Sequence, residues 1–276
     1  MPQPIFLLLV ATVLPLVSFV ILVFVGKRMG RPLAGIVGTA AIFGSFLLSI
    51  GALIAWGQDK PRSYQVNHIV YKYGMGELAI NYPIDWIPAQ YAHEHGGVIT
   101  KFLQVGFYVD SLTIIMFLMI TLVATLVHIF SIAYMGEDKR FARFFTYLGL
   151  FCFSMLGLVM GGTILQLFIF WELVGLCSYL LIGFWYEKKS ASNAAIKAFV
   201  VNRVGDFGFL IGLGILFYHL GNVTLPDVWA SLNVNQFLTT NGALPSEVTL
   251  PNGLHMTSTL MTIMGIGLFL DRKSVV

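Results

Sequence analysis

The stretch Ile164–Trp185 reads ILQLFIFWELVGLCSYLLIGFW, and Glu172 is its only charged residue. An apolar run of this length is long enough to cross the hydrocarbon core of a bilayer as a helix. A charge at membrane depth is costly, so an acidic residue in such a run marks an ion or proton path by default. The stretch therefore indicates a membrane protein in which Glu172 transfers protons or ions. The alternative is a static buried ion pair that pins two helices together.

Composition agrees with a membrane protein. Of the 276 residues, 57% are hydrophobic and 11% are charged, whereas about 25% are charged in a soluble domain. The two cysteines, Cys152 and Cys177, lie inside apolar runs and are expected to pack rather than to form a disulfide or a metal site. The sequence contains no Gly-rich phosphate loop, no haem or iron–sulfur spacing and no nucleophile triad. We therefore expect no redox centre, no cofactor and no metal in this chain, and no nucleic-acid partner.

The apolar segments predict an all-α polytopic membrane protein, a transmembrane helix bundle of about six full spans and a truncated seventh. The six full spans are expected at Ile5–Val25, Leu33–Trp56, Ser111–Tyr134, two within Phe144–Trp185, and Ala194–His219. Gly161, Gly162 and Thr163 supply the turn that divides Phe144–Trp185 into a hairpin. The seventh run begins near Met256 and stops after Leu270, which is short of a full span.

These spans divide the chain into five regions. They are a transmembrane hairpin (1–56), an external loop with a short strand (57–110), a transmembrane core with buried charges (111–219), a second external loop (220–255) and the truncated seventh span (256–276). The partial alternation in Phe102–Asp110 predicts the strand. Asp110-Ser111 then resembles a helix N-cap. His93-Glu94-His95 lacks further ligands at a recognisable spacing, so we interpret it as a solvated loop rather than a metal site.

Basic residues predict the orientation of the spans. They follow the first, third and fifth spans at Lys27, Arg28, Arg31, Lys139, Arg140, Arg143, Lys188 and Lys189. Short basic loops stay on the cytoplasmic or matrix side. The N-terminus is therefore expected outside, in a bacterial plasma membrane or, alternatively, an organellar inner membrane.

Two acidic residues are expected at similar depth. Glu172 has roughly 15 Å of helix on each side, and Asp206 lies near the midpoint of the next span. Arg203 is three residues before Asp206 and shares its helix face. Lys197 lies on the other side of that helix and nearer the inner surface, where it is a candidate for an inner-side proton path; the alternative is that it snorkels to that surface. His128, deep in the third span, is a candidate relay; the alternative is a hydrogen-bonded packing residue.

Burial raises the pKa of a carboxyl group and a nearby cation lowers it. A buried glutamate near a movable lysine or arginine can therefore take up a proton when the pair separates and release it when the pair closes. We expect Glu172 to transfer protons in this way. We expect Asp206 to remain ionised beside Arg203 and to modulate the site.

Four stretches carry a family resemblance: VHIFSIAYM (127–135), FFTYLGLFCFSMLGLVM (144–160), LFIFWELVGLCSYLLIGFWY (167–186) and NAAIKAFVVNRVGDFGFLIG (193–212). They resemble the N-terminal part of the L subunit (chain 5) of proton-pumping NADH–quinone oxidoreductase, respiratory complex I, in the antiporter-like subunit family. The resemblance implies that Glu172 transfers protons and that Asp206 and Arg203 modulate it. It also implies a subunit of an enzyme, with neighbouring antiporter-like subunits as partners. NADH, FMN, iron–sulfur clusters and quinone would be bound by other subunits.

The C-terminus departs from the family pattern. The family's seventh span carries an essential lysine after a glycine, whereas this chain reads GIGLFL and then DRKSVV. Lys273 arrives too early and lacks that glycine, so the role is not assigned to it. We expect 271–276 not to be native sequence. Two other functions remain open: the large subunit of a multi-subunit sodium/proton antiporter, and a structural membrane scaffold with static ion pairs.

Overall fold

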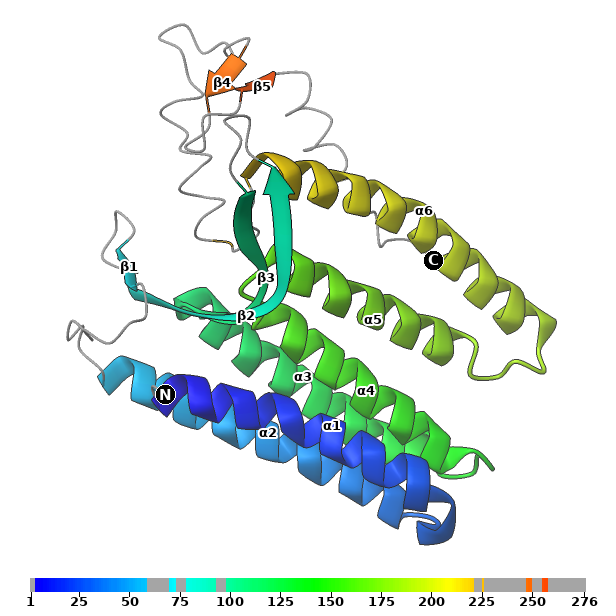
Figure 1. Ribbon diagram of the computed structural model, residues 1–276. Coiled ribbons are helices and arrows are strands. Elements are labelled where there is room, and N and C mark those ends of the chain that lie inside the picture. The colour runs from blue at the N-terminus through cyan, green and yellow to red at the C-terminus, as the bar shows by residue number, and fades with distance from the viewer. Residues whose placement is uncertain are drawn as a thin grey trace, which may run out of the picture. The chain divides into compact units, whose positions relative to one another are not determined.

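The computed structural model describes residues 3–58, 70–72, 78–92, 98–220, 225, 247–249 and 255–257. The chain forms two compact units. The first contains 1–80, 109–160 and 170–199, and the second contains 81–108, 161–169 and 200–276. Each unit is described by itself below (Figure 1).

Six long helices dominate the described residues. They are α1 (Gln3–Met29), α2 (Leu33–Gln58), α3 (Ser111–Tyr134), α4 (Phe141–Val159), α5 (Ile164–Ile182) and α6 (Lys189–Leu220). All six are long and apolar enough to cross a membrane. This confirms the predicted all-α polytopic architecture with six full spans.

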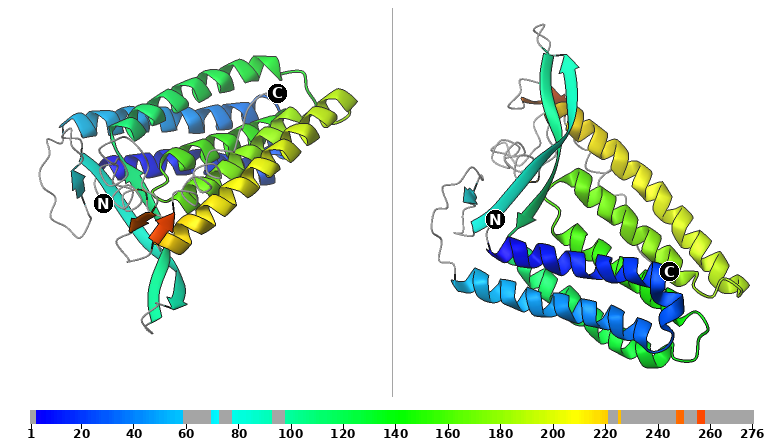
Figure 2. Two further views of the ribbon diagram at one scale, coloured as in Figure 1. Left: turned by 90° about the horizontal axis from the view of Figure 1, so that it is seen from above. Right: turned by 60° about the horizontal axis from the view of Figure 1, so that its bottom comes forward.

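Helices α1 to α4 form the core of the first unit. The ribbon views show them side by side (Figures 1 and 2), with α1 packed against α2 and α4, and α2 against α3. Gly30 ends α1 with a φ of 65°, a left-handed conformation that glycine adopts without steric cost. One buried cluster joins the helix ends near the α3–α4 loop, and its members are Leu22, Ala34, Met135, Phe141, Phe145 and Phe184.

The start of α3 is fixed by its N-cap. The Oδ1 atom of Asp110 accepts hydrogen bonds from the Thr113 backbone N at 2.7 Å and from the Thr113 hydroxyl at 2.8 Å. These bonds satisfy a donor that the first helical turn would otherwise leave without a partner. The predicted capping role of Asp110 is therefore confirmed.

In the region expected to be an external loop with one short strand, the described residues form three strands. They are β1 (Val70–Lys72), β2 (Leu78–Ala92) and β3 (Val98–Val109), in the order β1-β2-β3. The expected strand at 102–110 overlaps β3, which begins four residues earlier and ends one residue earlier. Strand β2 was not predicted, because Pro83 and Pro88 interrupt its sequence and proline is uncommon inside sheets.

A second pair of strands, β4 (Glu247–Thr249) and β5 (His255–Thr257), is antiparallel. Met256, near which the seventh span is expected to begin, pairs with Val248 across this ladder. The hydropathy pattern did not predict this pair of strands. Val248, Thr249 and Thr257 are β-branched residues, which favour strands. The remainder of the expected span, including 271–276, lies outside the described residues.

The turn predicted at Gly161–Thr163 separates α4 from α5 and is anchored to β3 within the second unit. The Gly162 N–H donates to the Gly106 carbonyl at 2.9 Å, and the Gly106 N–H donates to Oε1 of Gln166 at 3.0 Å. A Cβ on Gly162 would lie 2.9 Å from the Gly106 carbonyl carbon, so only glycine permits this approach. Thr163 caps α5 by accepting from the Gln166 N–H at 3.1 Å.

Candidate functional site

Glu172 lies near the middle of α5, in the first unit. The helix has 19 residues, which corresponds to a length of about 28 Å. The Glu172 side chain is half-buried, and its Oε1 atom is fully buried. The only charge of this helix thus lies far from both helix ends, where water is least available to solvate it.

Asp206 and Arg203 form an ion pair on α6, in the second unit. The Arg203 Nη1 atom lies 3.8 Å from Asp206 Oδ2. The Asp206 side chain is only 4% exposed, whereas that of Arg203 is 51% exposed. The second carboxylate oxygen, Oδ1, is buried and accepts no hydrogen bond from any described residue. The structure therefore brings together these two of the predicted site residues.

Asp206 belongs to the inward-facing stripe of α6. Phe209, Leu213 and Leu216 are buried in the same stripe, at the three- and four-residue spacing of one helix face. Phe209 stacks on Phe168 of α5, with ring centroids 5.3 Å apart. These contacts turn the carboxylate toward protein and leave the guanidinium of Arg203 at the outer edge.

Lys197 occupies the exposed side of α6, in the first unit. Its neighbour Ile196 is 53% exposed. The structure thus does not place Lys197 in the stripe of Asp206, in agreement with their spacing in the sequence. Its part in an inner-side proton path stays a prediction.

His128 is buried in α3, with 1% of its surface exposed. Its Nδ1 atom lies 2.7 Å from the Ala124 carbonyl oxygen, and its ring lies 5.9 Å from that of Phe145. Because a carbonyl oxygen only accepts, Nδ1 carries the proton in this bond. This geometry supports a packing role for His128, and its role as a proton relay stays a prediction.

A row of buried hydroxyls on α2 and α3 was missed in the sequence. Its members are Ser45, Ser49, Thr121 and Thr125. Each donates to a carbonyl one turn earlier on its own helix, for example Thr125 to the Thr121 carbonyl at 2.7 Å. Ser45 also donates to the Ala11 carbonyl of α1 at 2.7 Å. The four-residue spacing of the pairs Ser45/Ser49 and Thr121/Thr125 is the signal that could have revealed this row.

A metal site is not found in the described part of the chain, where no three His, Cys, Asp or Glu side chains converge. Cys152 and Cys177 are both buried, with exposures of 3% and 0%. Ser154 lies 3.9 Å from the Cys177 sulfur, so this thiol packs among protein atoms. The tripeptide His93-Glu94-His95 lies outside the described residues.

The fold and the buried charges define a class: a polytopic helical membrane protein with ionisable residues inside its spans. Two family models identify the family within this class. The N-terminal model of complex I chain 5 matches residues 100–145, and the "NADH:quinone oxidoreductase/Mrp antiporter, TM" model matches 161–269. Together these matches cover more than half of the chain. The chain belongs to this family of antiporter-like membrane subunits, and its resemblance to the complex I L subunit is confirmed.

Relatives and a solved structure agree with this assignment. NAD(P)H-quinone oxidoreductase chain 5 of Synechocystis is 41% identical over 197 residues, covering 69% of this chain and 29% of the relative. NADH-quinone oxidoreductase subunit L of Rickettsia bellii is 38% identical over 217 residues, covering 78% and 30%. The chain thus spans less than a third of the length of these relatives.

The structural neighbour belongs to the membrane-bound sulfane sulfur reductase, an archaeal respiratory membrane complex. The similarity has a TM-score of 0.61 at 18% identity and covers 82% of this chain and 40% of the other. At this identity the match shows a shared fold.

Proposed function

We propose that this chain is a proton-translocating membrane subunit of an NADH–quinone oxidoreductase, coupling electron transfer elsewhere in the complex to proton movement through buried charges. The observation that carries the proposal is the placement of carboxylates within membrane-length helices: Glu172 in α5 and the buried Asp206 in α6. Ionisable residues inside spans are rare and costly, and they usually line ion or proton paths. The oxidoreductase subunits among the relatives supply the enzyme context.

Each charged residue has a proposed part. Glu172 takes up and releases a proton as its electrostatic surroundings change. The Asp206–Arg203 pair, whose charged atoms lie 3.8 Å apart, modulates the site electrostatically. Lys197 lies on the path to the inner side. His128 is either a relay or a hydrogen-bonded packing residue, and the variant His128→Gln distinguishes these two roles.

The redox chemistry belongs to other subunits in this proposal. NADH, FMN, iron–sulfur clusters and quinone would bind there, and this chain would contribute proton translocation alone. Neighbouring antiporter-like subunits would be its partners within the membrane. The exposed charges of Lys197 and Arg203 on α6 support coverage by protein, since lipid contact with them would be costly.

The proposed orientation has the N-terminus outside. The α3–α4 loop and the turn after α5 both carry clustered basic residues, which favours the cytoplasmic or matrix side for both. A bacterial plasma membrane and an organellar inner membrane are both compatible with this arrangement.

The test is Glu172→Gln in the assembled complex, with Glu187→Gln as the matched control. Glu187 undergoes the same chemical change, but its side chain is 72% exposed in the turn after α5. We expect Glu172→Gln to lower proton translocation per electron by about tenfold or more without loss of assembly, and the control to retain it. Unchanged translocation in an assembled Glu172→Gln complex would instead support the structural scaffold.

The second candidate function is the large subunit of a multi-subunit sodium/proton antiporter. The matched transmembrane family includes Mrp antiporters by its description. Proton movement in vesicles would then require sodium and proceed without NADH. NADH-driven acidification in sodium-free buffer would exclude this alternative.

A further inference from the structure

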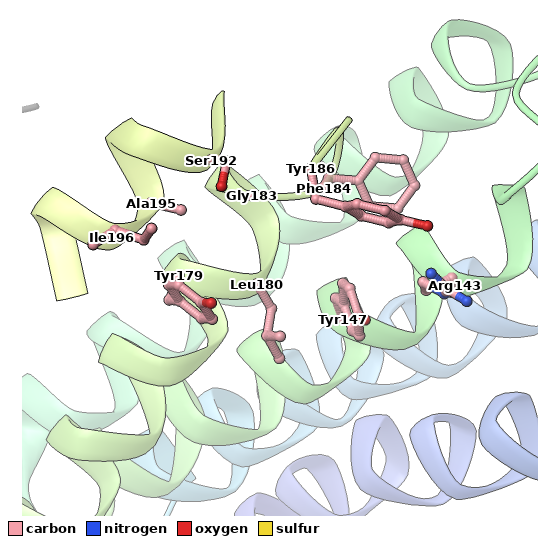
Figure 3. Close-up of a pocket in the computed structure, with 10 residues that line it drawn as sticks. All are labelled: Arg143, Tyr147, Tyr179, Leu180, Gly183, Phe184, Tyr186, Ser192, Ala195 and Ile196. Atoms are coloured by element: carbon pink, nitrogen blue, oxygen red, sulfur yellow. The ribbon is translucent and has the colours of Figure 1, made fainter. Parts of the chain in front are cut away.

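A pocket of about 220 Å³ opens in the first unit at the end where α4 and α6 begin and α5 ends. Figure 3 shows its walls, contributed by α4, the last turn of α5 with the residues after it, and the first turns of α6. The lining residues are Arg143, Tyr147, Tyr179, Leu180, Gly183, Phe184, Tyr186, Ser192, Ala195 and Ile196. Neither Glu172 nor Asp206 is among these lining residues.

The polar lining consists of a cation and several hydroxyls. Arg143 forms neither an ion pair nor a side-chain hydrogen bond with any described residue. The hydroxyls of Tyr147, Tyr179 and Tyr186 likewise have no hydrogen-bond partner within the described ranges. Arg143 can donate two parallel hydrogen bonds to a phosphate, and the tyrosine hydroxyls can donate to its remaining oxygens.

The neighbouring Arg140 shows how a cation at this surface is paired within the chain. Arg140 lies 3.6 Å from the Glu187 carboxylate and stacks over the rings of Phe184 and Tyr186 at 5.5 and 4.8 Å. Arg143 lies one turn along the same helix and has no such carboxylate. Its charge is therefore available to an anion from outside the described chain.

The rest of the lining is largely apolar and lies at the ends of three membrane-length helices. Leu180, Phe184 and Ile196 form the apolar wall, and Ile182 and Ile196 are 37% and 53% exposed beside it. A free phosphate would leave this wall without a partner, whereas the glycerol and upper acyl chain of a lipid would cover it. Tyrosine and arginine at this depth are typical of the headgroup region.

We propose that this pocket binds an anionic phospholipid, with the lipid phosphate on Arg143 and the tyrosine hydroxyls and the start of an acyl chain along Leu180 and Ile196. Basic pockets between spans on the cytoplasmic or matrix side are suited to anionic headgroups. The binding fixes the α4, α5 and α6 ends to one another at the lipid surface.

The test is a lipid titration of the delipidated full chain in detergent, followed by native mass spectrometry. Phosphatidylglycerol is compared with phosphatidylcholine of identical acyl chains. We expect the first phosphatidylglycerol to bind more tightly, and Arg143→Gln to weaken it by roughly tenfold, the effect of one charge-assisted hydrogen bond. Tyr147→Phe removes only a hydroxyl and is expected to weaken binding by roughly threefold.

Lys139→Gln is the matched control, because it removes one exposed charge in the preceding loop without lining the pocket. We expect it to change the affinity by about twofold or less. Equal losses in Arg143→Gln and Lys139→Gln would show diffuse surface attraction and overturn the proposal. Equal affinity for the two lipids, or displacement of phosphatidylglycerol by equimolar inorganic phosphate, would also overturn it.

Discussion

Helices α3 and α6 both bury polar side chains along one face, but they satisfy them differently. On α3, Thr121, Thr125 and His128 each lie 2.7 Å from a carbonyl oxygen of their own helix. On α6, Asp206 has an ion-pair partner at 3.8 Å for one oxygen and no hydrogen-bond donor among the described residues for the other. The polar groups of α3 are thus satisfied within their own helix, whereas the carboxylate on α6 is satisfied only in part.

The polar faces of α3 and α6 therefore contribute differently to stability. A buried hydroxyl with a partner contributes about 1 kcal/mol to stability, and it remains neutral in any protonation state of its surroundings. A buried carboxylate costs several kcal/mol to desolvate, and its partners only partly offset this cost. Burial alone therefore does not distinguish the polar faces of α3 and α6, whereas the incomplete satisfaction of the Asp206 carboxylate does.

The largest expected effect follows from Asp206→Asn in the assembled complex. The change removes the charge and preserves the side-chain volume, so the complex should assemble while proton translocation falls by about tenfold. Thr125→Val on α3 is the control, with translocation retained. If both variants retain wild-type translocation, the difference between the polar faces of α3 and α6 does not affect proton movement.

A smaller effect is expected from His128→Gln. Losing the bond to the Ala124 carbonyl and the contact with Phe145 should lower the free energy of unfolding by about 1–3 kcal/mol. Thermal unfolding in detergent measures this loss, and translocation per assembled complex should stay near the wild-type value. Loss of proton translocation at unchanged stability would instead assign His128 to a relay. That result would contradict the contrast drawn between α3 and α6.

The smallest effect concerns Asp138, an acid in the α3–α4 loop whose oxygens both accept hydrogen bonds. The Trp185 indole donates to Oδ2 at 2.9 Å and the Arg140 N–H to Oδ1 at 2.7 Å. The Trp185 bond, followed by the Arg140 backbone bond, lowers the pKa of Asp138 below its usual value of 3.8. The resulting stabilisation is present above the usual pKa and is lost as the pH falls through the lowered value.

Tryptophan fluorescence measures this transition. The wild type should change its Trp185 emission only at a pH below the ordinary aspartate range, and Asp138→Asn should abolish the step. The effect will be small and weaker in high salt, since Asp138 is near the surface. A step at or above the usual aspartate pKa would contradict the assignment of both bonds.

The sequence was sufficient to locate the helices where apolar character begins and ends sharply. The bounds of α3 match the predicted Ser111–Tyr134, because Asp110 caps one end and a polar loop follows the other. Helix α6 begins at Lys189, five residues before the predicted start. Hydropathy detects only its apolar part, whereas Lys, Ser and Ala continue the same helix outside that part.

Other features depend on contacts between distant residues and could not be predicted in this way. The bond from Gly106 to Gln166 joins positions 60 residues apart. The inward stripe of α6 is also set by packing, which fixes rotation about a helix axis. The spacing predicted that Arg203 and Asp206 meet, but not that one is exposed and the other buried.

The burial of Cys152 and Cys177 has a practical consequence for studying the chain. Their exposures of 3% and 0% shield both native thiols from water-soluble maleimides, which attack accessible thiolates. A single cysteine introduced at Lys139 would then be the reactive position, without prior removal of either native one. Modification of that position from one face of a sealed vesicle reports directly which compartment the α3–α4 loop enters.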